Sequence, residues 1–116
     1  MAKELFNKEL KERLEVPNLY ETDGKEEKET IVKVRFYDLC SSWEWYLIEA
    51  DIKEEGVICF GWVVGFEKEL GYFSINELED INKKFPRIIR DEEFELISLA
   101  DLKKKYKEPY RPYPKL

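Results

Sequence analysis

The chain has 116 residues, of which 43% are hydrophobic and 40% charged, and its formal net charge at pH 7 is -6. This length suits one domain with one core, and the acidic balance disfavours nonspecific binding of nucleic acid by the whole body because the phosphates would be repelled. The two cysteines cannot form the disulfide framework of small secreted domains, and no apolar run is long enough for a membrane span, so we expect a soluble cytoplasmic protein.

The first expected element is a short helix that follows Asn7, a residue favoured at helix N-caps. Leu10 and Leu14 would share one face of this helix, and Pro17 would end it. Residues 18–29 have no apolar periodicity and many charges, which predicts a solvated loop.

Three strands are expected next, over residues 30–37, 43–51 and 57–64. The first alternates between apolar and polar residues, and the loop at 53–56 predicts a hairpin between the second and the third. The third is almost continuously apolar, which indicates a central strand. In a regular strand 43–51, one face carries Trp43, Trp45 and Leu47, and the other carries Tyr46, Ile48 and Ala50.

The C-terminal half predicts a turn over residues 67–71, a short strand at 72–73 and a helix over 75–84. Ser74 and Glu77 have the spacing of a capping box at the start of that helix. A last strand is expected at 94–97, followed by a short helix that Ser98 and Asp101 cap. The proline-rich segment 107–116 predicts an extended tail.

This order predicts an α+β fold, an antiparallel sheet of about four to five strands with helices packed mainly on one face. We expect a single domain over residues 1–116, with the proline-, tyrosine- and lysine-rich tail at about 107–116.

The residue types disfavour an enzyme. Histidine is absent, which removes the commonest general base and metal ligand. Cys59 lies in an apolar strand and predicts an inert thiol, so Cys40 is the only candidate reactive thiol. We expect no zinc, no other metal and no cofactor. The acidic side chains that could hold a hard metal would not converge, since Glu44 and Glu49 lie on opposite faces of a regular strand.

Two kinds of interaction site remain. Residues 1–100 hold 24 acidic and 14 basic side chains, a net charge of -10, and residues 101–116 hold 2 acidic and 6 basic ones, a net charge of +4. The first candidate is a partner-binding surface of aromatic and acidic residues, Trp43, Trp45, Glu67 and Glu69. The alternative is a nucleic-acid-binding module that uses the aromatic sheet face and the basic tail, with Lys105, Lys107, Arg111 and Lys115.

Several stretches resemble a family of bacterial proteins, the domain of unknown function family 2958. The stretches are Leu19-Tyr20-Glu21-Thr22, Trp43-Glu44-Trp45-Tyr46, Phe60-Gly61-Trp62-Val63-Val64-Gly65 and Glu69-Leu70-Gly71-Tyr72-Phe73-Ser74-Ile75-Asn76-Glu77-Leu78. The resemblance supplies no catalytic residue. It implies an accessory protein of plasmids, phages and integrated elements, sometimes found near antirestriction genes. We therefore expect a non-enzymatic protein that binds another protein, as an acidic inhibitor of a host defence or DNA-handling protein.

Overall fold

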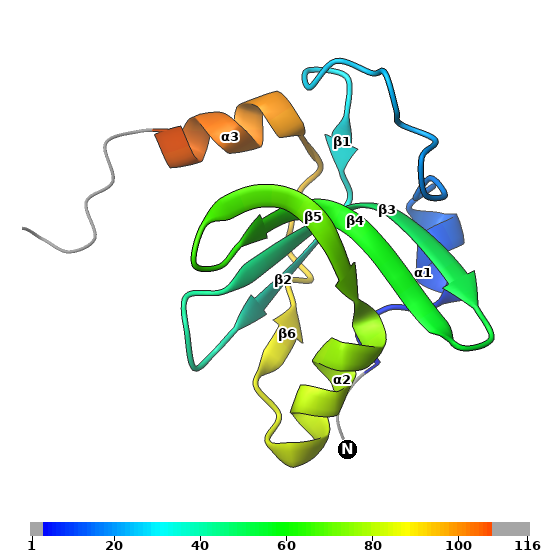
Figure 1. Ribbon diagram of the computed structural model, residues 1–116, viewed down its shortest axis with the longest axis vertical. Coiled ribbons are helices and arrows are strands. Elements are labelled where there is room, and N and C mark those ends of the chain that lie inside the picture. Colours follow the sequence, from blue (N-terminus) through cyan, green and yellow to red (C-terminus); the bar gives the residue numbers. More distant parts are fainter. Residues whose placement is uncertain (1–3, 108–116) are drawn as a thin grey trace, which may run out of the picture.

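The computed structural model describes residues 4–107, and Figure 1 shows how the elements are arranged. The helices are α1 (Lys8–Arg13), α2 (Ile75–Lys84) and α3 (Leu99–Lys107), and the strands are β1 (Ile31–Val32), β2 (Val34–Asp38), β3 (Glu44–Lys53), β4 (Gly56–Val64), β5 (Lys68–Ser74), β6 (Ile88–Arg90) and β7 (Ile97–Ser98). The expected α+β fold with an antiparallel sheet is confirmed.

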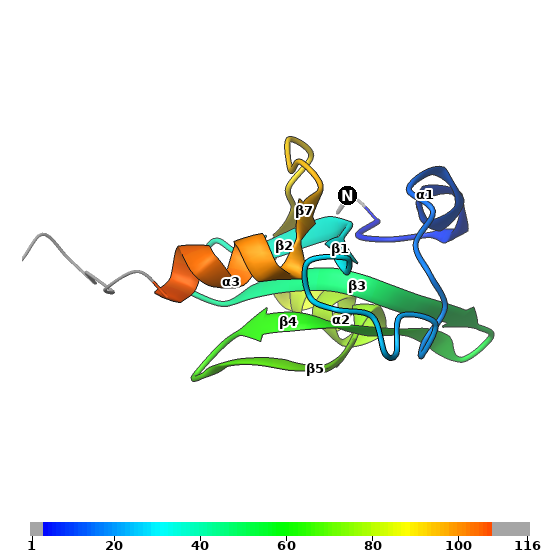
Figure 2. The ribbon, with the colours of Figure 1, turned by 90° about the horizontal axis from the view of Figure 1, so that it is seen from above.

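The main sheet has five strands in the order β5-β4-β3-β2-β6, and β1 pairs with β7 in a separate two-stranded sheet. All of these pairings are antiparallel. The expected hairpin is β3–β4, which closes with Lys53 opposite Gly56, and β4 lies inside the sheet between β3 and β5. Figure 2 shows β5 at the side of the sheet away from β2 and α1.

Both faces of the sheet carry a hydrophobic cluster. The first face contributes Phe36, Trp45 and Leu47, and α1 and α2 pack there through residues such as Leu10 and Leu78. The second face contributes Tyr46, Ile48 and Trp62, and α3 packs there through Leu99 and Leu102. The helices are thus not all on one face, because residues of α3 share a cluster with the side chains that point away from α1 and α2.

A β-bulge changes the expected side-chain directions in β3. Leu47 pairs with Gly61 and Glu49 with Phe60, so Ile48 is the extra residue. Such a residue reverses the alternation that follows it. The expectation that Ala50 shares a face with Ile48 is therefore wrong, since Ala50 packs with Trp45 and Leu47 in the first cluster.

Local sequence signals predicted the bounds of the first two helices well, but the bounds of several strands differ from those expected. Asn7 caps α1 through its side chain, which accepts a hydrogen bond from the Leu10 N–H, and α2 spans the residues expected. The strand expected over 30–37 is divided into β1 and β2, and β5 begins at Lys68 and not at Tyr72. The strand expected over 94–97 overlaps β7 only at Ile97, and β6 was not expected.

No helix within residues 4–107 is long and apolar enough to cross a membrane. The expected extended tail begins at the last residue of α3 and otherwise lies outside the described residues.

Candidate functional site

An aromatic corner, which we define as Trp43, Trp45 and Phe66, lies at the end of the sheet that holds the β2–β3 and β4–β5 turns (Figure 1). The ring centroids of Trp43 and Trp45 are 5.8 Å apart, and those of Trp43 and Phe66 are 5.4 Å apart with an edge-to-face angle of 81°. These are favourable aromatic geometries. The side chain of Phe66 is 95% exposed, so the corner ends in an aromatic ring that lies almost entirely in water.

The backbone of the β4–β5 turn fits closely against Trp43 because residue 65 is a glycine. A Cβ atom at Gly65 would lie 2.4 Å from the indole ring of Trp43. Real Cβ atoms do not approach other atoms so closely, so only glycine lets the turn lie against the ring. This contact fixes the backbone of the turn that carries Phe66.

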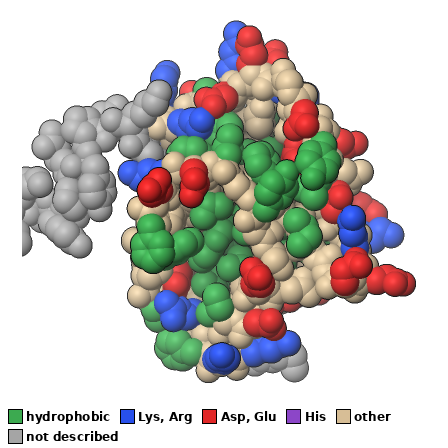
Figure 3. All heavy atoms as spheres, in the orientation of Figure 1, with side chains coloured by type: hydrophobic (Ala, Val, Ile, Leu, Met, Phe, Trp, Pro, Cys, Tyr) green, Lys and Arg blue, Asp and Glu red, His purple; other side chains and the backbone are tan. Residues whose placement is uncertain are grey.

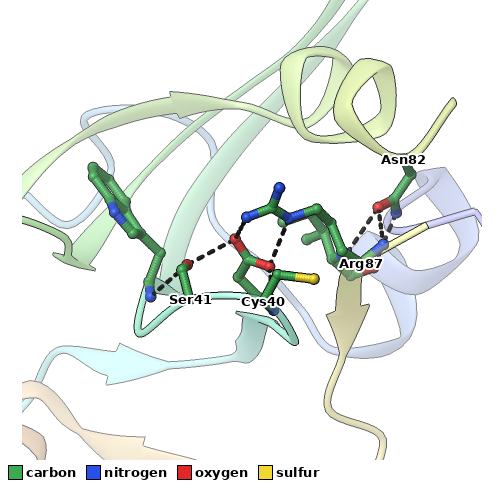
Figure 4. Close-up of polar contacts among 7 residues, drawn as sticks. Cys40, Ser41, Asn82 and Arg87 are labelled. Atoms are coloured by element: carbon green, nitrogen blue, oxygen red, sulfur yellow. Dashed lines mark hydrogen bonds and ion pairs between the residues drawn. The ribbon is translucent and has the colours of Figure 1, made fainter. Parts of the chain in front are cut away.

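A chain of hydrogen bonds from α2 holds the backbone that carries Trp43 (Figure 4). The Trp43 N–H donates to Ser41 Oγ at 3.2 Å, and the Ser41 hydroxyl donates to Asp38 Oδ2 at 2.7 Å. Arg87 donates through Nε and one Nη to the two oxygens of Asp38, each at 2.9 Å. The Arg87 N–H donates to Asn82 Oδ1, also at 2.9 Å, which connects the loop to α2.

Asp38 is the centre of this chain of bonds. Its side chain is 7% exposed, and it also accepts the N–H of Cys40 at 2.8 Å. The hydrogen bonds from Arg87 outweigh the cost of burial and lower the pKa of Asp38 from 3.8 to about 2. The same contact raises the pKa of Arg87. The carboxylate is therefore ionised at neutral pH and stabilises the loop before Trp43.

The residues predicted to bind a partner fall into two groups. Trp43 is half-buried, and Glu67, which follows Phe66 in the β4–β5 turn, and Glu69 in β5 are both exposed. Trp45, by contrast, is only 7% exposed and belongs to the core beneath Trp43. Trp45 pairs with Val63, which pairs with Glu69, so these three residues form one row across the sheet.

Phe66 is the member of the corner that sequence reasoning missed. It is a large apolar residue in a short turn between Gly65 and Glu67, where polar residues are usual. An apolar residue in such a turn is the sequence signal that could have identified Phe66 as a candidate binding residue. Its contact with Trp43 could not be anticipated, since it depends on the alignment of two separate turns.

The basic residues of the alternative site are only partly described. Lys105 is exposed on α3, and Lys107 ends this helix. Arg111 and Lys115 lie outside the described residues. Of these four basic residues, Lys105 alone has a side chain within the described part of the structure.

The structure also shows the surroundings of the two thiols and of the possible metal ligands. Cys59 is fully buried, and burial raises the pKa of its thiol, whereas Cys40 is exposed. Among the described residues no three Asp, Glu or Cys side chains gather as a metal site.

The expected separation of Glu44 and Glu49 is wrong. The bulge places both on the second face, where Glu44 accepts the hydroxyl of Tyr46. Glu49 is buried and accepts the N–H groups of Tyr20 and Thr22, so its carboxylate fastens the preceding loop to the sheet.

Comparison with known proteins gives one match. The family model described as protein of unknown function (DUF2958) matches residues 5–104. No curated protein and no solved structure matches the chain.

Proposed function

The chain belongs to the DUF2958 family of proteins of unknown function, and we propose that it acts by binding another protein through the aromatic corner, without catalysing a reaction. In this proposal it is an accessory protein of a mobile genetic element. Its partner is a basic DNA-handling or defence protein of the host. The observation that carries the proposal is the exposure of Phe66 in a turn whose backbone packs against Trp43.

An exposed Phe in a turn with a fixed backbone is well suited to binding another protein. Removing a Phe side chain from water contributes about 1.5–3 kcal/mol, and aromatic residues in central pockets dominate many interfaces. The close contact of the Gly65 backbone with the Trp43 ring fixes the turn that carries Phe66 before any partner arrives. Binding then costs less backbone conformational entropy than it would for a mobile turn.

The charge beside the ring favours a basic partner. Glu67 and Glu69 are both exposed, and they lie on a chain with a net charge of -6. Acidic side chains around an apolar anchor attract a basic surface and repel nucleic acid. A basic channel that normally takes DNA would fit this combination.

The test is capture of partners from the native host by the purified full-length protein. We expect Phe66→Ala to reduce capture at least about tenfold, a change of about 1.4 kcal/mol, while leaving the thermal midpoint within about 2 °C. Leu96→Ala is the control, because Leu96 is also an exposed apolar side chain and lies between β6 and β7, outside the hydrogen-bonded segments that support Trp43.

A charge-reversed protein tests the acidic component. Glu67→Lys with Glu69→Lys changes the net charge by two units per substitution, from -6 to -2. We expect capture to weaken most at low salt. Glu54→Lys with Glu55→Lys produces the same net charge at the β3–β4 turn, the opposite end of the sheet, and should bind normally. If both double variants lost capture equally, the net charge of the chain alone would determine partner binding, and a local acidic site would be refuted.

Fluorescence anisotropy with labelled single- and double-stranded oligonucleotides tests the alternative function. We expect negligible binding at two salt concentrations. Tight, salt-sensitive binding that disappears when residues 107–116 are deleted would replace the proposal with a nucleic-acid-binding tail.

A further inference from the structure

The strand β5 forms an open edge of the main sheet. It has seven residues and one strand neighbour, β4, within the part of the chain that the structure describes. The other edge strand, β6, has only three residues, and Arg90 at its end donates to the carbonyl groups of Glu4 and Leu5. Long unpaired edges can accept another strand, and proteins usually block them with prolines, bulges or charges. The β4–β5 register contains no bulge and β5 contains no proline, and its two charged residues, Lys68 and Glu69, are confined to its start.

The backbone groups that β5 offers can be derived from the turn before it. The Gly65 N–H donates to the Glu67 carbonyl at 2.9 Å, so these two residues form a hydrogen-bonded pair. Hydrogen-bonded and non-hydrogen-bonded pairs alternate along an antiparallel ladder. Residues 69, 71 and 73 therefore bond to β4, whereas residues 68, 70 and 72 direct their N–H and C=O groups away from the sheet.

Gly71 leaves space on the first face of this edge. A Cβ atom at Gly71 would meet nothing within 4 Å, and its backbone is not among the glycines with positive φ. The fold itself therefore does not require a glycine there. The opposite holds for Gly61 in β4, where a Cβ atom would lie 1.9 Å from the Tyr46 carbonyl oxygen. Glycine in a strand often marks a place where another chain approaches closely.

Beyond Lys68, the second face of the same edge exposes Leu70 and Tyr72, and the Tyr72 side chain is hydrogen-bonded to Tyr20. Leu70 is 38% exposed and Tyr72 is 56% exposed, and the Tyr72 ring lies 5.1 Å from that of Phe60. Figure 3 shows hydrophobic side chains over the region where Figure 1 places β4 and β5, with charged side chains around them. A strand added beside β5 would bury part of this surface.

We propose that β5 accepts an extended segment of a basic partner protein as a sixth strand of the main sheet. The segment places a Lys or Arg opposite Glu69, a long side chain over Gly71, and apolar residues opposite Leu70 and Tyr72. A second copy of this chain fits less well, because each copy has a net charge of -6 and the two copies repel each other. This inference deepens the proposed function and rests on it, since it names the kind of segment that is bound.

The probe is a blocked seven-residue peptide of alternating lysine and valine, added to the labelled full-length protein. We expect NMR shift changes and slower amide exchange at residues 68, 70 and 72, at peptide concentrations up to about 1 mM. A peptide of alternating glutamate and valine should not bind. The lysine peptide with N-methylated amides should bind at least about tenfold more weakly, because it cannot pair with the edge.

A matched pair of variants tests the edge from the protein side. Leu70→Pro removes an outward N–H that is not bonded to β4, and should weaken binding of the lysine peptide at least about tenfold. Leu70→Ala keeps that N–H and should weaken binding of the lysine peptide by less than Leu70→Pro does. If Leu70→Pro does not fold, the N-methylated peptide makes the same comparison on the native chain.

The outcomes separate this inference from the proposed function. Equal binding of the N-methylated peptide, shift changes away from β5, or no binding at about 1 mM would overturn strand addition. Host proteins captured equally by the native chain and Leu70→Pro would also overturn it, but would leave protein binding intact. Capture of no host protein would instead refute the proposed function.

Two other occupants of the edge would also overturn the proposed partner. A dimer in sedimentation that Leu70→Pro abolishes would assign the edge to a second copy. Slow exchange of the residue 68, 70 and 72 amides in the free chain that is lost on deleting residues 108–116 would assign it to the chain's own C-terminal segment.

Discussion

Removing the charge of Asp38 should destabilise the protein at neutral pH and have little effect in acid. Asp38→Asn keeps an oxygen that can accept the Cys40 N–H but loses the ionic contacts with Arg87. The pKa of Asp38 falls from 3.8 to about 2 on folding, which corresponds to at most about 2.4 kcal/mol at 1.36 kcal/mol per unit. Because Arg87 is partly in solvent, we expect about 1–2 kcal/mol at pH 7.

The pH dependence follows from the direction of this shift. A carboxylate whose pKa is lowered in the folded state stabilises the protein above its unfolded pKa, here 3.8. As the pH falls toward about 2, the unfolded chain binds the proton first and the stabilisation is lost. The difference between the native protein and Asp38→Asn should therefore shrink between about pH 4 and pH 2.

Urea unfolding followed by tryptophan fluorescence, repeated from pH 7 to pH 2.5, measures this difference. Asp80→Asn is the control, because Asp80 is highly exposed and its contact with Lys83 is 3.4 Å long, so its loss should cost less than about 0.5 kcal/mol. A deficit of Asp38→Asn that stayed constant down to pH 2.5 would show that the ionised carboxylate is not its source. Equal stability of the two proteins at pH 7 would refute the stabilising role of the contact.

Three further predictions concern the fold and metal binding. Ser74→Ala should lower the free energy of unfolding by roughly 1 kcal/mol in denaturant melts, because Ser74 Oγ accepts the Glu77 N–H at 3.3 Å, and an unchanged midpoint would contradict the cap. Gly61→Ala should destabilise the protein by more than about 3 kcal/mol, because its Cβ would collide with a backbone carbonyl, whereas Gly71→Ala should leave the thermal midpoint unchanged or raise it. Chelators should not change the thermal midpoint, and elemental analysis should find no stoichiometric transition metal; a large loss of stability in chelator would contradict this.

The candidate site illustrates the limit of sequence reasoning at particular residues. The sequence indicated a surface of aromatic and acidic residues, and the turn before Glu67 and Glu69 contacts Trp43 through Phe66. It could not separate Trp45, which packs in the core, from Trp43, which supports Phe66. Burial depends on which elements cover a strand, and that information is not present in the strand itself.

The sequence by itself determined the elements whose causes lie within a few residues. The capped helix α2 follows from Ser74 and the apolar spacing after it, and the β3–β4 hairpin follows from the short polar loop between two apolar runs. Only the tertiary structure decided the bulge at Ile48, the placement of α3 on the second face, the contact of Phe66 with Trp43 and the open edge of β5. Each of these depends on contacts between segments far apart in the chain, and local patterns do not specify such contacts.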